Sequence, residues 1–326
     1  MRKGALEGLD VRRYRPGDER DIVELFRLVF HKKLSIDEWR WKYDQNPYPN
    51  KMIMLCYAGD GRLAAHCAGI PSWARVDGRQ AVFIQTVDAM SHPRCRRGAF
   101  VRTVRAAMNE FRSPDALFFG FPDPRHLRLG ELKLGYRNVC LVPEFVRSSP
   151  LLHGEEIPDG SDEIVREVTC FGREADELWT SCQEDYSCAV VRNSAYLNWR
   201  YRDCPRRRYR MFAIVASDGS WKGWAVFSRE RATAVLVDML VTKPYARSAT
   251  GLIASALREY RRDWALWCRA WIPPCSPARE SLRCLGFRPV SRHSGLALTV
   301  QPDISGAMPV NVESEFYYQM GDSDMF

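Results

Sequence analysis

The segment Arg94-Cys95-Arg96-Arg97-Gly98-Ala99 has the residue types of an anion-binding turn. It follows an apolar run over 81–90 and precedes apolar side chains at three- and four-residue spacing over 100–111, a pattern that predicts a strand, a cationic turn and a helix. The first N–H groups of a helix lack intrahelical partners, and the helix dipole places partial positive charge at that end. Three arginines and a glycine that allows close backbone approach therefore indicate a site for a phosphate or pyrophosphate. A solvated basic turn without a ligand explains the segment equally well.

Three titratable side chains close to this segment in sequence or on neighbouring predicted strands could transfer protons. Asp88 lies between two apolar residues on the predicted central strand, where a buried carboxylate is costly unless a partner compensates its charge. His66 lies in an apolar strand, and His92 directly precedes Pro93. Each also has a structural interpretation: the echo of Asp88 at Asp238 favours a role common to both halves, His66 could be a core histidine, and His92 could shape the turn.

Composition and charge bound the class of protein. A chain of 326 residues with 46% hydrophobic and 27% charged residues is long enough for two globular domains. Its formal net charge of +8 favours anionic partners such as a cofactor phosphate, nucleic acid or an acidic carrier. The eleven cysteines include no CxxC pair, and several lie in apolar runs, so we expect reduced core thiols in a cytoplasmic protein and no metal site. No segment has the length and apolarity of a membrane span or a signal peptide, so we expect no membrane association.

Local patterns predict the elements that must position these residues. Strands are expected at 9–14, 52–58, 63–71 and 116–121, hairpin turns at Gly59-Asp60-Gly61 and Asp77-Gly78, and helices after Asp18 and over 125–134. Gly135 is expected to end the second of these helices as a C-cap.

The second half of the chain repeats the first. Four short motifs occur in both halves in the same order, with displacements of 158, 158, 150 and 151 residues. The pairs are Trp41-x-Tyr43 and Trp199-x-Tyr201, Asp60-Gly61 and Asp218-Gly219, Val87-Asp88 and Val237-Asp238, and Gly135-Tyr136 and Gly286-Phe287. This order predicts two copies of one α/β unit. The Trp-x-Tyr motifs are expected to pack against the sheet, with an aromatic wall for a ligand as the alternative.

A composition change between the copies predicts a linker. The segment from Ser148 to Ser161 is rich in Pro, Gly, Ser and acidic residues. We therefore expect an N-terminal domain over 1–147, a linker over 148–163 and a C-terminal domain over 164–326.

The arginine segment resembles the acyl-CoA-binding motif of the GNAT acyltransferase superfamily, Arg/Gln-x-x-Gly-x-Gly/Ala after a strand. Arg94 and Ala99 match its first and last positions, whereas Arg97 stands at its middle glycine, with Gly98 next to it. With the internal repeat, the chain resembles a tandem GNAT protein over nearly its whole length. The resemblance implies an α/β fold of two tandem units, each a mixed, mostly antiparallel twisted sheet flanked by helices. It also implies that strands four and five of a unit splay apart to admit the pantetheine arm.

The resemblance further implies which residues bind the cofactor. Backbone groups of Ala89, Met90 and Ser91 would bind the pantetheine amides. The phosphates would be bound by the turn and the start of the helix: Arg94, Arg96, Arg97, Gly98, Ala99 and Phe100. Asp123 stands near a position where related chains carry an Asn, and a helix cap before Pro124 is its alternative role.

The second copy has a weaker version of the turn. The segment from Lys243 to Gly251 has one arginine and a late glycine. We therefore expect the first copy to bind acyl-CoA and the second to be degenerate, with a structural or substrate-shaping role.

In this superfamily a tyrosine four residues before the Gly-Phe that ends the short helix often assists the leaving thiolate. That position is Glu131 here and Leu282 in the second copy. Transfer to an amine also needs a group that removes the amine proton, since only the free base attacks a thioester. The remaining candidates for proton transfer are Asp88, Glu131, Tyr136 and His66.

The function that these features favour is an N-acyltransferase. It would use acetyl-CoA or another acyl-CoA as co-substrate, without a metal, and would act on a primary amine of a small molecule, an amino sugar or a carrier-bound intermediate. One alternative is an aminoacyl transferase that resembles the Fem-type enzymes and takes aminoacyl-tRNA, although the phosphate turn suits coenzyme A better and nucleic acid is the less expected partner. The other alternative is a non-catalytic tandem binding module.

Overall fold

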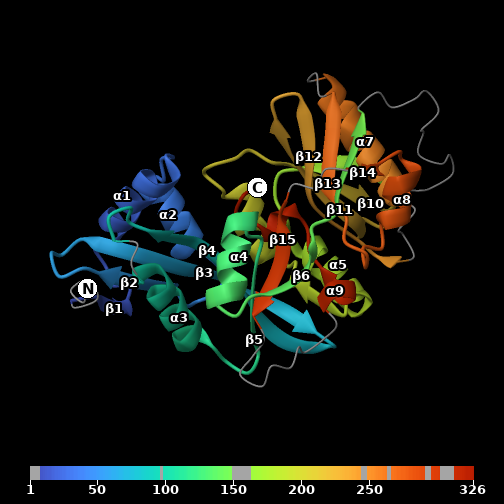
Figure 1. Cartoon of the computed structure of the whole chain (residues 1–326). Helices are drawn as coiled ribbons and strands as arrows, with labels where there is room; N and C mark the ends of the chain where they lie inside the picture. Colours follow the sequence, from blue (N-terminus) through green and yellow to red (C-terminus); the bar gives the residue numbers. More distant parts are fainter. Residues whose placement is uncertain are drawn as a thin grey trace. The chain divides into compact units, whose positions relative to one another are not determined.

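The computed structural model describes residues 8–95, 98–148, 163–243, 248–262, 266–290, 295–301 and 312–326. The chain divides into two compact units (Figure 1). Unit 1 comprises Met1–Trp73, Ala81–Val139 and Ala297–Met308, and unit 2 comprises Ala74–Gln80, Cys140–Leu296 and Pro309–Phe326. Arg96 and Arg97 of the predicted phosphate turn and most of the predicted linker lie outside the described residues.

Unit 1 is built on a sheet with the strand order β1-β2-β3-β4-β5-β15-β6. Its strands are β1 (Asp10–Arg13), β2 (Met52–Tyr57), β3 (Leu63–Val76), β4 (Arg79–Ser91), β5 (Ala116–Gly120), β15 (Ala297–Gln301) and β6 (Arg137–Leu141). The printed ladders are antiparallel for β1 with β2, β2 with β3 and β5 with β15, whereas β4 and β5 are parallel because α3 (Ala99–Phe111) connects them. The predicted hairpin at Asp77-Gly78 is confirmed, since both residues have the positive φ of a tight turn, 48° and 74°.

Helices lie on both sides of this sheet. The helices α1 (Glu19–Phe30) and α2 (Ile36–Tyr43) lie on one side of β2 and β3, and α3 lies on the other (Figure 1). Helix α2 begins at Ser35, whose hydroxyl and Glu38 form a capping box. On the opposite side, Val104 and Met108 of α3 pack with Met54 of β2. Alternating strand residues thus face two different helical layers.

Unit 2 repeats this plan on the strand order β14-β7-β13-β12-β11-β10-β8. Its strands are β14 (Arg288–Pro289), β7 (Glu144–Ser148), β13 (Trp267–Trp271), β12 (Thr233–Val241), β11 (Trp221–Glu230), β10 (Arg210–Val215) and β8 (Ile164–Val168). Its helices include α5 (Arg173–Cys182), α6 (Ser194–Leu197), α7 (Ser248–Arg262) and α8 (Arg279–Cys284), with a π-helical turn, η2, over Asn198–Arg202. As in unit 1, the longest helix of the unit connects two parallel strands: α7 follows β12 and precedes β13 in the chain. The predicted fold class, an α/β fold of two units that each have a mixed, mostly antiparallel sheet flanked by helices, is confirmed.

Each sheet takes a strand from the other half of the chain. In unit 1, β15 pairs with β5 through Thr299 and Gly120. In unit 2, β7 pairs with β13 through Val146 and Arg269. The last residues of β3, Ala74 to Val76, belong to unit 2 and pair with β9 (Cys188–Val190). The predicted boundaries at residues 147 and 164 divide the chain in sequence order. The strands that pair across these boundaries could not be predicted, because the residue pattern of a strand does not identify its partner.

The described part of the chain contains no helix that is both long enough and apolar enough to span a bilayer.

Candidate functional site

The ladder between β4 and β5 ends near the middle of β4. Their parallel ladder begins at Val82 and Ala116 and ends at Gln85 and Phe119. Strand β4 continues to Ser91, and among the described residues no pair with β5 follows Gln85. Strand β5 itself ends at Gly120, so the end of β4 extends past it, and the expected divergence of strands four and five stays a prediction. The predicted pantetheine-binding residues Ala89, Met90 and Ser91 all lie on this end of β4, which has β3 as its neighbour on the other side.

The end of β4 beyond its ladder with β5 leads into the start of α3. Gly98 is the residue before the helix, and its positive φ of 82° is a conformation that glycine adopts without strain. The first helical hydrogen bond runs from the N–H of Arg102 to the carbonyl of Gly98, so the N–H groups of Ala99, Phe100 and the following residue have no partner within the helix. The first turn has no acidic residue that would oppose an anion.

Arg94 and His92 form the turn between β4 and α3. The side chain of Arg94 is exposed, and its backbone N–H donates to Nδ1 of His92 at 3.1 Å. His92 thus shapes the turn, as its structural interpretation predicted. Arg96 and Arg97, which complete the predicted phosphate site, lie outside the described residues.

Asp88 is the centre of a buried polar cluster on the α2 side of the sheet. Its Oδ2 accepts hydrogen bonds from Nζ of Lys42 at 2.9 Å and from the hydroxyl of Tyr43 at 2.5 Å. The backbone of Asp88 has a positive φ of 47°, which is unusual for a residue with a side chain. Burial by itself would raise the pKa of Asp88, but the charge of Lys42 and the neighbouring His66 and Tyr43 outweigh it, so the pKa lies below its ordinary value.

His66 completes this cluster from β3. Its Nδ1 lies 2.7 Å from the carbonyl oxygen of Asp88. Because a carbonyl only accepts, Nδ1 carries the proton and Nε2 has a free lone pair. The ring is fully buried, burial lowers its pKa, and Nε2 has no hydrogen-bond partner among the described residues. His66 is thus buried as a core histidine would be, with a hydrogen-bond partner among the described residues for only one of its two ring nitrogens.

Tyr136 and His126 form a second group, on the α3 side of the sheet. The rings are stacked with centroids 5.8 Å apart, and the hydroxyl of Tyr136 lies 3.5 Å from Nε2 of His126. The ring of Phe100, in the first turn of α3, meets His126 edge-on at 5.8 Å. Burial raises the pKa of Tyr136 and lowers that of His126, so the tyrosine keeps its proton and the histidine is neutral near pH 7.

Glu131 and Asp123, at opposite ends of α4 (Pro124–Lys133), do not belong to either group. The side chain of Glu131 is exposed on α4. Oδ1 of Asp123 accepts from the N–H groups of Arg125 at 2.8 Å and His126 at 2.9 Å. The alternative role that we gave Asp123, a helix cap before Pro124, is the one that the structure shows.

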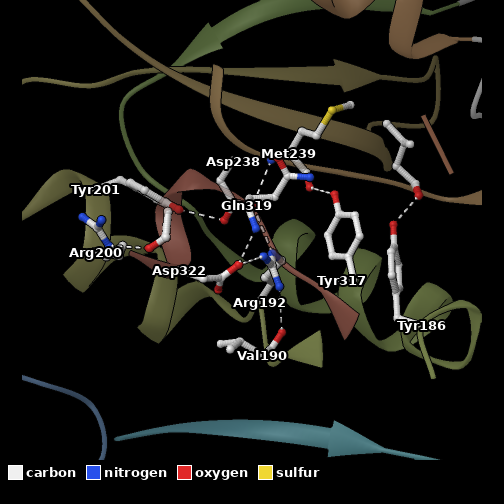
Figure 2. A network of polar contacts seen from close by, with 12 residues as sticks. Tyr186, Val190, Arg192, Arg200, Tyr201, Asp238, Met239, Tyr317, Gln319 and Asp322 are labelled. Atoms are coloured by element: carbon white, nitrogen blue, oxygen red, sulfur yellow. Dashed lines mark hydrogen bonds and ion pairs between the residues drawn. The ribbon is translucent and has the colours of Figure 1, made fainter. Parts of the chain in front are cut away.

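Unit 2 contains a matching buried carboxylate, Asp238 (Figure 2). The hydroxyl of Tyr201 donates to its Oδ2 at 2.7 Å, as Tyr43 does to Asp88. The second partner is Nε of Arg192 at 3.2 Å. The structure thus shows what the repeated Trp-x-Tyr and Val-Asp motifs have in common: the tyrosine of the first bonds the aspartate of the second in both units. From the sequence we expected these tyrosines to pack against the sheet. The Trp-x-Tyr motif precedes the Val-Asp motif in both halves, and this repetition was the signal that could have indicated a contact between the tyrosine and the aspartate.

No protein-family model and no curated protein sequence matches the chain. Solved structures do match its fold. A GCN5-related N-acetyltransferase from Anabaena variabilis has a TM-score of 0.67 at 13% identity, over 90% of this chain and 72% of that one. A probable N-acyltransferase from Enterococcus faecalis has a TM-score of 0.65 at 11% identity, over 90% and 72%. The N-myristoyltransferase of Saccharomyces cerevisiae, solved with bound myristoyl-CoA, has a TM-score of 0.57 at 11% identity, over 91% and 83%.

These matches cover about 90% of the chain, and they agree with the parallel strands β4 and β5 and the helix α3 that connects them. The chain has the fold of the GNAT superfamily. The arrangement of this fold is tandem, with two units that repeat one plan.

Proposed function

We propose that this protein is an acyl-CoA-dependent N-acyltransferase whose unit 1 binds the acyl-CoA. The observation that carries the proposal is the end of β4, which extends beyond its ladder with β5 after Gln85 and leads directly to the N–H groups at the start of α3 that have no partner within the helix. The edge of a strand suits the extended arm of a carrier, and the helix terminus to which it leads suits a pyrophosphate. The names of the structural neighbours, N-acetyltransferases and an N-myristoyltransferase with bound myristoyl-CoA, support the same class of reaction.

The residues at the end of β4 and the start of α3 fit this carrier. Backbone groups of Ala89 and Ser91 on β4 would bind the amides of the pantetheine arm. The N–H groups of Ala99 and Phe100, with Arg94 and the arginines at 96 and 97, would bind the phosphates. The carrier supplies the reactive thioester. The transfer forms a C–N bond to the amine and breaks the C–S bond, the amine gives up a proton, and the thiolate takes one.

His66 is the better of the two candidate bases in the Asp88 cluster. The carboxylate of Asp88 already accepts from Lys42 and Tyr43, and its lowered pKa makes it a weak base. Nε2 of His66 has a lone pair and no partner among the described residues. Because the ring is fully buried, a water molecule would carry the proton from the amine to Nε2. Asp88 then acts as a positioning residue, since its carbonyl fixes the tautomer of His66.

Tyr136 is the candidate acid. Its raised pKa keeps the hydroxyl protonated, and a protonated hydroxyl can donate to a departing thiolate. Glu131, at the position where the superfamily often has its tyrosine, is exposed and lies outside this group.

Binding of acetyl-CoA, measured by titration calorimetry, tests the proposal. Combined replacement of Arg94, Arg96 and Arg97 by alanine removes charge-assisted contacts to phosphate, so we expect roughly 10- to 100-fold weaker binding. Arg173→Ala is the matched control, because this arginine is 89% exposed on α5 and pairs with Glu177 one helical turn away. Equal affinity in the triple variant and the control would remove the proposed site.

Thiol release separates catalysis from binding. A series of acyl-CoA chain lengths with a panel of primary amines should give amine-dependent release of free thiol. His66→Gln should lower kcat and change its pH profile while the affinity for acyl-CoA stays within about twofold. Binding without release across the panel would favour the non-catalytic module, and a salt-dependent mobility shift with tRNA without acyl-CoA binding would favour the Fem-type alternative.

A further inference from the structure

In unit 2, the end of β12 beyond its ladder with β13 is the counterpart of the end of β4 beyond its ladder with β5. On its other side this end of β12 pairs with β11 as far as Val241. The parallel ladder of β12 with β13 ends at Leu236 and Ala270, and β12 continues to Val241. The displacement of 150 residues between the Val-Asp motifs makes Met239 the counterpart of Ala89, and Val241 the counterpart of Ser91. The backbone groups that would bind a pantetheine arm in unit 1 therefore have equivalents in unit 2.

Tyrosine hydroxyls occupy these equivalent groups in unit 2. The hydroxyl of Tyr317 donates to the carbonyl of Met239 at 2.5 Å, and the hydroxyl of Tyr186 donates to the carbonyl of Val241 at 2.9 Å. Figure 2 shows both bonds side by side. The two rings are buried and in contact, with centroids 4.6 Å apart. The two tyrosines thus satisfy the carbonyls of Met239 and Val241, and their rings exclude water from this edge of β12.

Tyr317 belongs to a segment that is anchored beside β12. The segment consists of β16 (Phe316–Tyr317) and the turn η4 (Met320–Asp322), and β16 pairs with β9. Nη2 of the buried Arg192 bonds Asp322 at 2.8 Å. The guanidinium of Arg200, also buried, donates to the carbonyls of Gly321 and Ser323, both at 2.9 Å.

The fit of this segment is close. A Cβ on Gly321 would lie 2.0 Å from the hydroxyl oxygen of Tyr201 and 3.3 Å from Cβ of Asp238. Residue 321 therefore has to be glycine for the segment to pack against the Tyr201 and Asp238 pair. In unit 1, by contrast, no side chain among the described residues donates to the carbonyl of Ala89 or Ser91.

We propose that the segment 316–323, together with Tyr186, is a built-in occupant of the acyl-carrier groove of unit 2. It takes the hydrogen bonds on β12 that the amides of a carrier arm would take, so each chain binds one acyl-CoA, in unit 1. An acyl-CoA in unit 2 would have to break two buried hydrogen bonds and displace two packed rings, with no gain in backbone bonds. This inference rests on the proposed function of unit 1.

Stoichiometry tests the inference. Titration of the full chain with acetyl-CoA should give one site per chain. Tyr186→Phe and Tyr317→Phe, alone and combined, keep the rings and remove the hydroxyls, so we expect each to lower the melting temperature by about 2–4 °C and to leave the stoichiometry and the affinity within twofold. Two sites per chain, or an acyl-CoA beside β12 in a crystal, would overturn the inference. Loss of binding in the tyrosine variants, with binding intact in the arginine triple variant, would overturn it as well.

A second variant tests the seating of the segment without any ligand. Gly321→Ala places a methyl group against Tyr201 and should lower the melting temperature by roughly 4–8 °C. Gly59→Ala is the control, since its added Cβ would make only ordinary contacts, 3.7 Å and longer. A Gly321→Ala protein as stable as this control would show that the segment does not fill the groove. Absence of any acetyl-CoA binding would instead refute the proposed function, and the melting temperatures would still decide whether the groove of unit 2 is filled.

Discussion

The two units hold equivalent buried carboxylates with different cations. Asp88 is paired with Lys42, the residue between Trp41 and Tyr43. The counterpart of Lys42 is Arg200, which donates to carbonyls of the segment 316–323, while Arg192 takes its place beside Asp238. The tyrosine bond to the carboxylate is common to both units and the cation is not. The two units therefore share the tyrosine hydroxyl that bonds the carboxylate. They differ in the cation after the tryptophan, which in unit 2 binds the segment 316–323.

The charges around the carboxylates differ in the same way. Lys42 bonds Asp88, and Arg192 bonds both Asp238 and Asp322. Burial, with Asp322 adding to it and Arg192 opposing it, raises the pKa of Asp238 to about 6, whereas the pKa of Asp88 lies below its ordinary value. The two clusters should therefore respond differently to substitution and to pH.

Removal of the cation should give the largest effect, and more so in unit 2. Arg192→Met leaves two buried carboxylates without their cation and should lower the free energy of unfolding by about 3–5 kcal/mol. Lys42→Met removes the cation from Asp88, which keeps the hydroxyl of Tyr43, so we expect a cost near the lower end of that range, about 3 kcal/mol. Chemical denaturation measures both, with Arg173→Met as the exposed control. A larger cost for Lys42→Met would contradict the view that Arg192 has the greater structural role.

Removal of the shared hydroxyl should have a smaller and similar effect in both units. Tyr43→Phe and Tyr201→Phe each delete one hydrogen bond to a buried carboxylate and keep the ring, so each should cost about 1.5–3 kcal/mol. The measurement is again the free energy of unfolding. A negligible cost in one unit alone would show that this bond is not the common element of the repeat.

The pH dependence should have opposite signs for the two carboxylates. The folded-state pKa of Asp88 is lowered, so its contribution to stability is present above the unfolded-state pKa and is lost as the pH falls below about 4. The folded-state pKa of Asp238 is raised to about 6, so the folded state binds its proton more tightly, and stability from this group falls as the pH rises from about 4 to about 6. The cost of Asp88→Asn should accordingly decrease at low pH, and the cost of Asp238→Asn should increase. Unfolding curves between pH 3 and pH 8 would show it, and equal slopes for the two variants would exclude the difference in environment.

Local chemistry predicted much of the fold. The four repeated motifs, the Asp77-Gly78 turn, the helix after Gly98 and the cap at Asp123 all follow from residues that are neighbours in sequence. The partner of Asp88 could not be predicted in this way, because Lys42 and His66 reach it from α2 and β3 through tertiary packing. The bonds between the tyrosines and β12 could not be predicted either, because no local sequence pattern connects the hydroxyl of residue 317 with the carbonyl of residue 239.

The strands exchanged between the halves have a consequence for biosynthesis. Gly120 of β5 and its partner Thr299 of β15 are separated by 179 positions in the chain. At about 5–20 residues per second, a ribosome needs roughly 10–40 s to make that stretch, and during this time one side of β5 presents unpaired backbone groups. The N-terminal half released alone would keep that open edge and would be prone to aggregate, whereas the co-expressed C-terminal half could supply the missing strand.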